Sequence, residues 1–358
     1  MNKHLISFGV AAGLLTLSTP AIAGQPTAYD YFPMDADNVW IFHTVEDKTD
    51  HRLDTVEVES SVYAGGGWYA SSLAGLFTAA IPVWDWFSGA TMLTHDGYAW
   101  SQFLDFDAAY GANWAMRSGP CTAYDVEFIN GADAVTPAGS FIAPKTFNFS
   151  FTPDANVKCA STPIQQVAFA QDVGLVTIDR EYSTSDLLFS RVDGVVVAAG
   201  AGETRYDAAG IGYSMALVAD EITQPHTIYC ITQPCYQPVE TLRLALILEN
   251  LTDQTITRTY NDGQAFDLDL FDQAAKSDPN VTSWSDGRFF TQAFWQLTLE
   301  PGEREVYLVE VPLVATKGPT QGANLAGEYQ VVGYFAGVDE DGVGAPKLST
   351  TIQVYPGQ

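Results

Sequence analysis

The chain alternates apolar and polar residues in short runs, and Gly, Pro, Asn or Asp interrupts each run. Successive side chains of a β-strand point to opposite faces, so this alternation predicts short strands. Residues 266–270 have one apolar and one polar face, whereas residues 242–248 are expected to have a buried side and a partly buried side. Asn-Asp-Gly at 261–263 signals a turn between strands at 255–260 and 266–270. No long amphipathic helix pattern occurs after residue 23, so the predicted class is all-β.

Composition excludes several classes of protein. The 358 residues include 43 Asp and Glu against 16 Lys and Arg, a net charge of −27. So few dispersed cations cannot form a basic face for a nucleic-acid backbone or an anionic membrane surface. Hydrophobic residues at 47% and aromatic residues at 13% exclude a disordered chain. We therefore expect no nucleic-acid partner, and we interpret the acids as a coat that keeps an exported protein in solution.

The first 23 residues have the pattern of a secretory signal peptide. A basic start at Lys3 and His4 precedes an apolar run at 5–17, and Ala-Ile-Ala at 21–23 is a small-x-small cleavage pattern. The run is shorter than the roughly 20 residues that a spanning helix needs, so we favour cleavage over an anchored helix. Cleavage would remove one base and no acid, which takes the charge from −27 to −28. We expect an exported protein of the periplasm, cell surface or extracellular space, with no integral membrane span after cleavage.

The four cysteines are expected to form disulfides, because an even number of cysteines outside the cytosol favours pairing. Of the three pairings that they allow, proximity in the sequence favours Cys121–Cys159 with Cys230–Cys235. The first bond would join distant segments and stabilise the fold by about 3–4 kcal/mol, whereas the second would close a tight loop around Pro234. No Cys-x-x-Cys motif and no histidine at ligand spacing accompanies them, which argues against a zinc site.

The length suits about two domains of ordinary size. Residues 195–212 are rich in Gly and Ala, which suits a linker or a loose crossover, and a new strand is expected to begin near Tyr213. We therefore place a domain boundary near residue 209. The predicted organisation is a signal peptide at 1–23, an N-terminal antiparallel β domain at 24–209 and a C-terminal domain at 210–358.

Several motifs of the second half follow one another in the order of a known family. They are residues 244–250 (LALILEN), 262–267 (DGQAFD), Val281 with 284–288 (WSDGR), 289–293 (FFTQA), 299–303 (LEPGE), and Leu325, Gly327 and Tyr329. In this order they resemble BsuPI, the intracellular proteinase inhibitor domain family, over about residues 210–358. The resemblance implies an immunoglobulin-like β-sandwich and a protein partner, namely a protease. It identifies no inhibitory residue.

The first half resembles a domain of exported bacterial proteins of unassigned function. The motifs are residues 31–34 (YFPM), 38–40 (NVW), 105–107 (DFD), 111–114 (GANW), 136–141 (TPAGSF) and 169–176 (FAQDVGLV). In that domain glycine would precede Val173-Gly174, and this chain has Asp172 instead. The resemblance implies a curved antiparallel sheet and identifies no activity.

No motif fixes a catalytic site. Residues 212–216 superficially match a nucleophile elbow, but an extended pattern continues after them, so Ser214 is interpreted as a strand hydroxyl. His95 lies in an expected turn, and a triad assembled from distant residues stays open. Acids at i, i+2, such as Asp267 and Asp269, point the same way on a strand and suit hard cations, but they nominate no metal site. We expect no cofactor and no metal.

Aromatic residues gather in one part of the first half. They are Trp68, Tyr69, Trp84, Trp86, Phe87, Tyr98 and Trp100. Packing within the core or on strand faces explains them most simply, and the alternative is a platform for a glycan or a partner protein. Trp84 and Trp86 would point to the same side of a strand. The candidate partner-binding residues are these two and Trp100, with Pro234 and Tyr236 in and beside the cyclised loop, which would lose little entropy on binding.

Three functions from different classes follow. The leading hypothesis is an exported, non-enzymatic protein that binds another protein, and the family resemblance suggests a protease. The second is a structural or adhesive module of the cell envelope or extracellular space. The third is a hydrolase, which would require a cleft where histidines and acids converge.

Overall fold

The computed structural model describes residues 26–77, 79–86, 89–159, 163–208, 210–225, 239–274 and 280–357, with only the backbone at 86 and 202–208. Within these ranges the chain forms 26 strands and one short helix, α1 (Ala28–Tyr31). The predicted all-β class is therefore confirmed. None of the described helical residues forms a helix long and apolar enough to cross a membrane.

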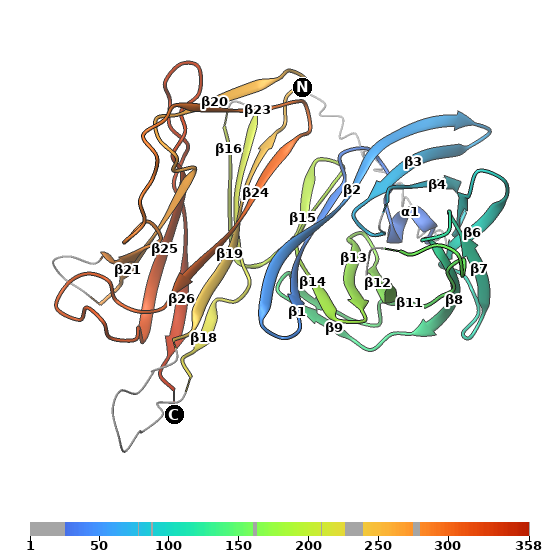
Figure 1. The fold of residues 1–358 in the computed structure, drawn as a ribbon, viewed down its shortest axis with the longest axis horizontal. Coiled ribbons are helices and arrows are strands. Elements are labelled where there is room, and N and C mark those ends of the chain that lie inside the picture. The colour runs from blue at the N-terminus through green and yellow to red at the C-terminus, as the bar shows by residue number, and fades with distance from the viewer. Residues whose placement is uncertain are drawn as a thin grey trace, which may run out of the picture.

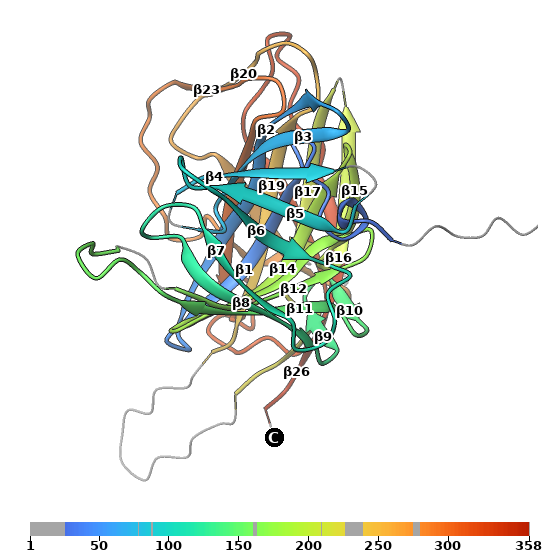
Figure 2. The same ribbon diagram turned by 90° about the vertical axis from the view of Figure 1, so that its right-hand side faces the viewer.

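The N-terminal unit is one antiparallel sheet of 13 strands that curls on itself (Figures 1 and 2). Its hydrogen-bonded order is β6-β5-β4-β3-β2-β1-β14-β13-β12-β11-β8-β7, and β15 pairs with β14. A separate hairpin consists of β9 (Ala134–Thr136) and β10 (Gly139–Phe141). The sheet strands are β1 (Val39–Glu46), β2 (Asp50–Gly65), β3 (Trp68–Ala74), β4 (Ile81–Trp86), β5 (Thr91–His95), β6 (Trp100–Asp105), β7 (Asn113–Arg117), β8 (Ala123–Asn130), β11 (Lys145–Phe151), β12 (Ile164–Ala170), β13 (Gly174–Arg180), β14 (Ser183–Val192) and β15 (Val195–Ala199).

The curl brings the two edge strands, β6 and β7, together. The Ser101 hydroxyl of β6 donates to the Arg117 carbonyl at 3.0 Å and accepts the Arg117 N–H at 2.9 Å. The Trp114 indole of β7 donates to the Phe103 carbonyl at 3.2 Å. Side chains thus bridge the two edges, which leaves less unpaired backbone open to other chains.

The concave face of this sheet encloses the larger core. The α1 segment lies inside the curl (Figure 1), and Phe32 after it is fully buried against Trp40 and Phe169. Trp40 is itself fully buried, and its indole N–H donates to the Val173 carbonyl at 2.6 Å. The residues before β1 therefore fill the interior of the curled sheet and do not form another strand.

The turn between β12 and β13 contains two residues in the left-handed conformation, Asp172 and Gly174. Gly174 has φ +93°, and a Cβ there would lie 2.4 Å from the Trp40 indole nitrogen, so the position requires glycine. Asp172 adopts φ +62°, a left-handed conformation that Asp tolerates better than most residues. Its N–H donates to the Asp30 carbonyl at 2.6 Å, so the turn forms without a glycine at position 172.

The C-terminal unit is a β-sandwich, as the family resemblance implied. Its four-stranded sheet has the order β16-β17-β19-β24, and its five-stranded sheet has the order β18-β26-β25-β21-β22. Apolar side chains of both sheets form one shared core. The strands are β16 (Ala201–Ala208), β17 (Ile211–Leu217), β18 (Glu221–Thr223), β19 (Thr241–Asn250), β20 (Ile256–Tyr260), β21 (Phe266–Asp272), β22 (Asn280–Ser283), β23 (Trp295–Leu299), β24 (Arg304–Pro312), β25 (Gly327–Phe335) and β26 (Leu348–Tyr355), with β20 and β23 forming a two-stranded sheet.

The four-stranded sheet also packs outward against the N-terminal unit (Figure 1). Ala245 and Ile247 of β19 join a buried cluster with Val39, Ile41 and Phe189 of the large sheet. The alternate residues of β19 face the sandwich core, so every residue from 244 to 250 is buried. The sequence predicted a partly buried second side for this strand. Arg243 on that side is half-buried, whereas the neighbouring unit buries Ala245 and Ile247.

A polar seam runs beside this apolar contact. Arg191 of β14 forms a buried ion pair with Glu249 of β19. Arg304 of β24 pairs with Glu57 of β2 at 2.7 Å and lies 3.6 Å from Glu249. These ion pairs join the two units, since each unit supplies one charge of the Arg191–Glu249 and Arg304–Glu57 pairs.

Hydrogen bonding places the change of unit near Gly200, between β15 and β16. Strand β16 pairs with β17, so residues 201–208 join the C-terminal unit. A Cβ on Gly200 would lie 2.2 Å from the Leu217 carbonyl oxygen, which shows how closely the chain crosses between units. The pairing therefore assigns β16 to the second unit, although it precedes the predicted boundary near 209.

The turn signal at 261–263 separates two strands that do not pair with each other. Strand β20 pairs with β23, whereas β21 pairs with β22 and β25. The Asn-Asp-Gly segment thus moves the chain from one sheet to another instead of closing a hairpin. The residues of the turn predict where strand β20 ends, but the strands with which β20 and β21 pair depend on the tertiary packing.

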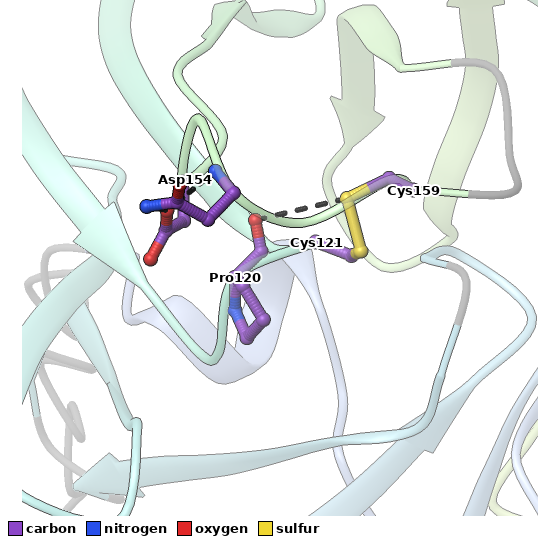
Figure 3. The surroundings of a disulfide bond; sticks show 5 residues. Pro120, Cys121, Asp154 and Cys159 are labelled. Atoms are coloured by element: carbon purple, nitrogen blue, oxygen red, sulfur yellow. Dashed lines mark hydrogen bonds between the residues drawn. A yellow bond between two sulfur atoms is a disulfide. The ribbon is translucent and has the colours of Figure 1, made fainter.

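A disulfide joins Cys121 to Cys159, with the two Cα atoms 5.3 Å apart (Figure 3). Cys121 precedes β8 and Cys159 follows β11, two strands that are already neighbours in the sheet. The bond therefore fastens the ends of a strand pair. Cys230 and Cys235 lie outside the described residues, as do residues 1–25, which include the expected signal peptide.

Candidate protein-binding surfaces

An exposed segment at residues 288–294 connects β22 to β23 in the sandwich, and it contains no regular secondary structure. Phe289 is 101% exposed and Phe294 is 79% exposed. Large apolar side chains in water are costly, so two of them on one short segment indicate a contact surface. Whether the segment can act as a contact surface depends on how firmly the rest of the sandwich holds it in place.

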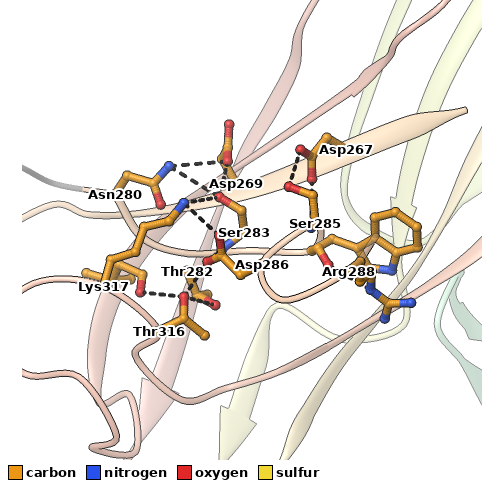
Figure 4. A network of polar contacts seen from close by, with 12 residues as sticks. Asp267, Asp269, Asn280, Thr282, Ser283, Ser285, Asp286, Arg288, Thr316 and Lys317 are labelled. Atoms are coloured by element: carbon orange, nitrogen blue, oxygen red, sulfur yellow. Dashed lines mark hydrogen bonds and ion pairs between the residues drawn. The ribbon is translucent and has the colours of Figure 1, made fainter. Parts of the chain in front are cut away.

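Asp286 anchors the start of the segment (Figure 4). Its carboxylate accepts the Ser283 N–H at 2.9 Å and the Thr316 hydroxyl, and it pairs with Lys317 at 3.1 Å. Burial alone would raise the pKa of Asp286, but the hydrogen bonds from Thr316 and Ser283 and the Lys317 ammonium together lower it. The acid therefore stays ionised and holds the turn before the exposed segment.

Asp267 and Asp269 of β21 hold the preceding residues in the same way (Figure 4). Asp267 accepts the Ser285 N–H at 3.1 Å and the Ser285 hydroxyl at 2.7 Å. Asp269 accepts the Ser283 hydroxyl at 2.6 Å and the Asn280 amide at 3.2 Å. The sequence had singled out this pair as a cation-type pattern, and in the structure the two carboxylates organise a loop.

Rings and a guanidinium continue the anchorage. The Arg288 guanidinium lies 4.1 Å from the centroid of the Trp284 ring, and its Nε donates to the Trp284 carbonyl at 2.8 Å. Trp284 packs on Phe266 at 4.4 Å and on Phe290 at 5.9 Å between ring centroids. Phe290 thus packs inward on Trp284, whereas the adjacent Phe289 is fully exposed. Phe290 therefore holds the segment in place, and Phe289 is available for contact with a partner.

The turn at 261–263 holds the middle and the end of the segment. The Gly263 N–H donates to the Thr291 carbonyl at 2.7 Å, and a Cβ on Gly263 would lie 2.6 Å from the Thr291 hydroxyl. The Trp295 indole donates to the Asp262 carbonyl at 2.7 Å and stacks on Tyr260 at 4.0 Å. The segment is therefore fastened before, within and after its exposed part, which reduces the entropy that binding would cost.

Sequence reasoning did not nominate residues 288–294. Residues 289–293 were part of the family resemblance, but no local pattern reports exposure of a phenylalanine. The available signal was the combination of the Asp-x-Asp pair at 267 and 269 with a serine-rich turn that could supply its hydroxyl partners.

A second surface lies on the convex side of the N-terminal sheet, where Ala64, Gly65, Trp68, Trp84, Leu93 and Trp100 line an open hollow of about 300 Å³. Trp84 and Trp100 meet edge to face with ring centroids 5.0 Å apart, and Trp100 is 53% exposed. His95 packs against Trp100 at 4.8 Å. Two of the three nominated tryptophans therefore meet on one face.

Strand alternation divides the predicted aromatic cluster between two faces of the sheet. Trp68 and Trp84 line the convex hollow, whereas Tyr69 lines a separate cavity with Asp85. Trp86 ends β4, and its side chain is outside the described part of the structure. Pro234 and Tyr236, the other nominated residues, also lie outside the described residues.

The residues weighed for hydrolysis occupy different sheets. Ser214 lies within β17 of the sandwich and is fully buried, so it sits on a strand as the sequence predicted. His95 ends β5 of the N-terminal sheet. His43 and His51 stack with ring centroids 5.1 Å apart, and burial, with smaller effects of His51 and Arg243, lowers the pKa of His43 to about 4. Among the described residues, no group of three or more His, Cys, Asp and Glu is placed to hold a metal ion.

Residues 231–340 match the model of BsuPI, the intracellular proteinase inhibitor family. The match covers most of the sandwich and includes the exposed segment 288–294. The C-terminal part is thus similar to an inhibitor domain, whereas the match does not extend to the N-terminal unit. No curated protein matches the chain.

Two of the solved structures with some similarity are bacterial β-glucosidases. A β-glucosidase, EmGH1, from Erythrobacter marinus is 15% identical with a TM-score of 0.25, and the match covers 40% of this chain and 15% of that enzyme. A β-glucosidase from Listeria innocua in complex with glucose is 10% identical with a TM-score of 0.24, and the match covers 46% of this chain and 18% of the enzyme. The chain spans less than a fifth of these enzymes, and similarities this low support no inference about activity.

Proposed function

We propose that this chain is an exported, non-enzymatic protein that binds a protease through residues 288–294 of its sandwich. The observation that carries the proposal is the pinned, exposed segment within the part that is similar to an inhibitor family. The segment would enter the protease cleft in extended form and add to the enzyme as a strand. Phe289 would then fill the primary specificity pocket.

The chemistry of Phe289 selects the class of protease. An aromatic side chain suits a serine protease with an apolar primary pocket and does not suit one whose pocket carries an acid for Lys or Arg. Phe294 would extend the apolar contact at the other end of the segment. Because the segment is held in place before binding, its ordering costs little of the contact free energy.

The test uses a protein of residues 24–358, which lacks only the expected signal peptide. It is assayed against chymotrypsin, trypsin and elastase. We expect inhibition of chymotrypsin and at least a tenfold weaker inhibition by the Phe289→Ala variant. Tyr110→Ala is the matched control, since Tyr110 is 71% exposed on the N-terminal unit and lies outside the segment. Absence of inhibition, or equal loss in both variants, would refute the proposal.

The convex hollow supports a second function, adhesion to a glycan-bearing surface. The specific observation is the edge-to-face pair of Trp84 and Trp100 beside an open apolar hollow, a geometry that offers ring faces to a sugar or a partner protein. Retention of the purified chain on native cell envelopes, lost in Trp100→Ala and kept in Phe289→Ala, would favour this function over protease binding.

A further inference from the structure

A small cavity lies on the concave side of the N-terminal sheet. It has a volume of about 250 Å³ and is lined by Tyr29, Met34, Asp35, Ser61, Tyr69 and Asp85. A water molecule occupies about 30 Å³ of liquid, so the cavity can hold a molecule of several heavy atoms. Neither of the surfaces described above includes any of these residues.

Asp85 is the unusual member of this lining. It lies in β4 and is 3% exposed, and its Oδ1 atom has no hydrogen-bond partner in the protein. A buried carboxylate oxygen without a partner costs free energy, so its presence in a native protein calls for a specific explanation. The neighbouring side chain on the same strand face, Val83, is fully buried in the core, so Asp85 lies at the margin of the apolar interior.

The other acid of the cavity is already engaged. The Tyr29 hydroxyl donates to Asp35 and lies 3.1 Å from both carboxylate oxygens of Asp193. Burial, with added effects of Asp35 and Asp193, raises the pKa of Tyr29, so this phenol remains a donor. Asp85 therefore faces a second acid whose partner is a neutral phenol, and the described lining contains no Lys, Arg or His.

The electrostatics of the cavity agree with a missing positive charge. Burial, and then the neighbouring Asp35, raises the pKa of Asp85 to about 6. Two carboxylates repel each other in a poorly solvated space, and a cation between them would relieve both effects. The tyrosine rings of the lining would add attraction for a cation through their faces.

We propose that this cavity binds the ammonium group of a small primary amine, with Asp85 Oδ1 as its main acceptor. An ammonium group presents three N–H donors and needs few acceptors, which matches two carboxylates and the Ser61 hydroxyl. A calcium ion takes six to eight oxygen ligands, more than two carboxylates and a hydroxyl supply. The Met34 and Tyr69 side chains offer apolar surface for a short alkyl chain.

Calorimetric titration of the full chain with n-butylammonium chloride tests the site at pH 7.5. We expect saturable binding at one site and at least a tenfold loss of affinity in Asp85→Asn, which keeps the shape and removes the charge. Glu127→Gln is the control, since Glu127 is an exposed acid on β8, away from the cavity lining. It should bind as the wild type does.

Thermal unfolding of the wild-type chain gives a second readout that needs no variant. n-Butylammonium should raise the melting temperature, whereas the neutral isostere n-butanol at equal concentration should not. No binding, equal affinity in wild type and Asp85→Asn, or saturable binding of calcium with none of the amine would each overturn the proposal. The inhibition assay uses a different surface, so each proposal can fail alone.

Discussion

Two buried carboxylates of this molecule are nearly equal in exposure and opposite in surroundings. Glu249 is 2% exposed and pairs with Arg191 across the contact between the two units. Asp85 is 3% exposed, and its Oδ1 has no partner in the protein. The exposed fraction of an acidic side chain therefore does not indicate its role, whereas its hydrogen-bond and ion-pair partners do.

This difference in partners separates acids that hold other groups in place from Asp85, whose Oδ1 has no hydrogen-bond donor in the protein. Glu249, and with it Asp267 and Asp286 in the sandwich, fix the position of other groups through ion pairs and hydrogen bonds. Asp85 fixes no group through its Oδ1, and it lines a cavity. The following substitutions test this contrast.

Removing the partner of Glu249 should have the largest effect. Arg191→Ala leaves Glu249 buried with only Arg304, at 3.6 Å, and should lower the free energy of unfolding by about 3–5 kcal/mol. Urea denaturation followed by tryptophan fluorescence measures this. The double variant Arg191→Met with Glu249→Leu should recover much of the loss, and a cost below about 1 kcal/mol for Arg191→Ala would contradict a structural role of the pair.

Asp85→Asn should act in the opposite direction. The folded chain keeps the Asp85 proton up to a pKa of about 6, whereas the ordinary value is 3.8, so ionisation destabilises the fold as the pH rises between these values. At pH 8 the variant should be more stable by up to about 3 kcal/mol, and the gain should disappear as the pH falls from 6 to 4. Denaturation series at pH 4, 6 and 8 measure it, and a gain independent of pH would be inconsistent with a buried charge.

Ser285→Ala should have the smallest effect. It removes the hydroxyl that donates to Asp267 at 2.7 Å but keeps the Ser285 N–H, so we expect a loss of about 1 kcal/mol. Inhibition of chymotrypsin should weaken a few-fold because the exposed segment is held less firmly. Ser72→Ala, which removes a hydroxyl bond to exposed Glu59 at 2.8 Å, serves as control. Equal stability losses in both variants would indicate that the network does not hold the segment.

The class of the fold was predictable because strand alternation is a local property. The alternation at 266–270 corresponds to β21, and Ser214 lies on a strand as its surroundings in the sequence indicated. The resemblance of the second half to an inhibitor family is matched at residues 231–340. Export, the protease partner and the absence of catalysis stay predictions.

The candidate sites were less predictable because they join residues that are distant in the chain. Trp84 and Trp100 meet on one face, but the neighbouring Tyr69 faces the other way with Asp85, since the register of β3 and β4 sets which side chains meet. The exposed segment depends on Asp267, Thr316 and Gly263, which belong to different elements.

The sequence by itself determined the all-β class and the turn residues at 261–263, because both depend on neighbouring residues. Only the tertiary structure decided that residues 244–250 of β19 are buried on both faces, that Glu249 pairs with Arg191 and that Asp85 Oδ1 has no partner in the protein. The physical reason is that the cost of a buried charge depends on what lies opposite it in space, and a linear order of residues does not contain that distance.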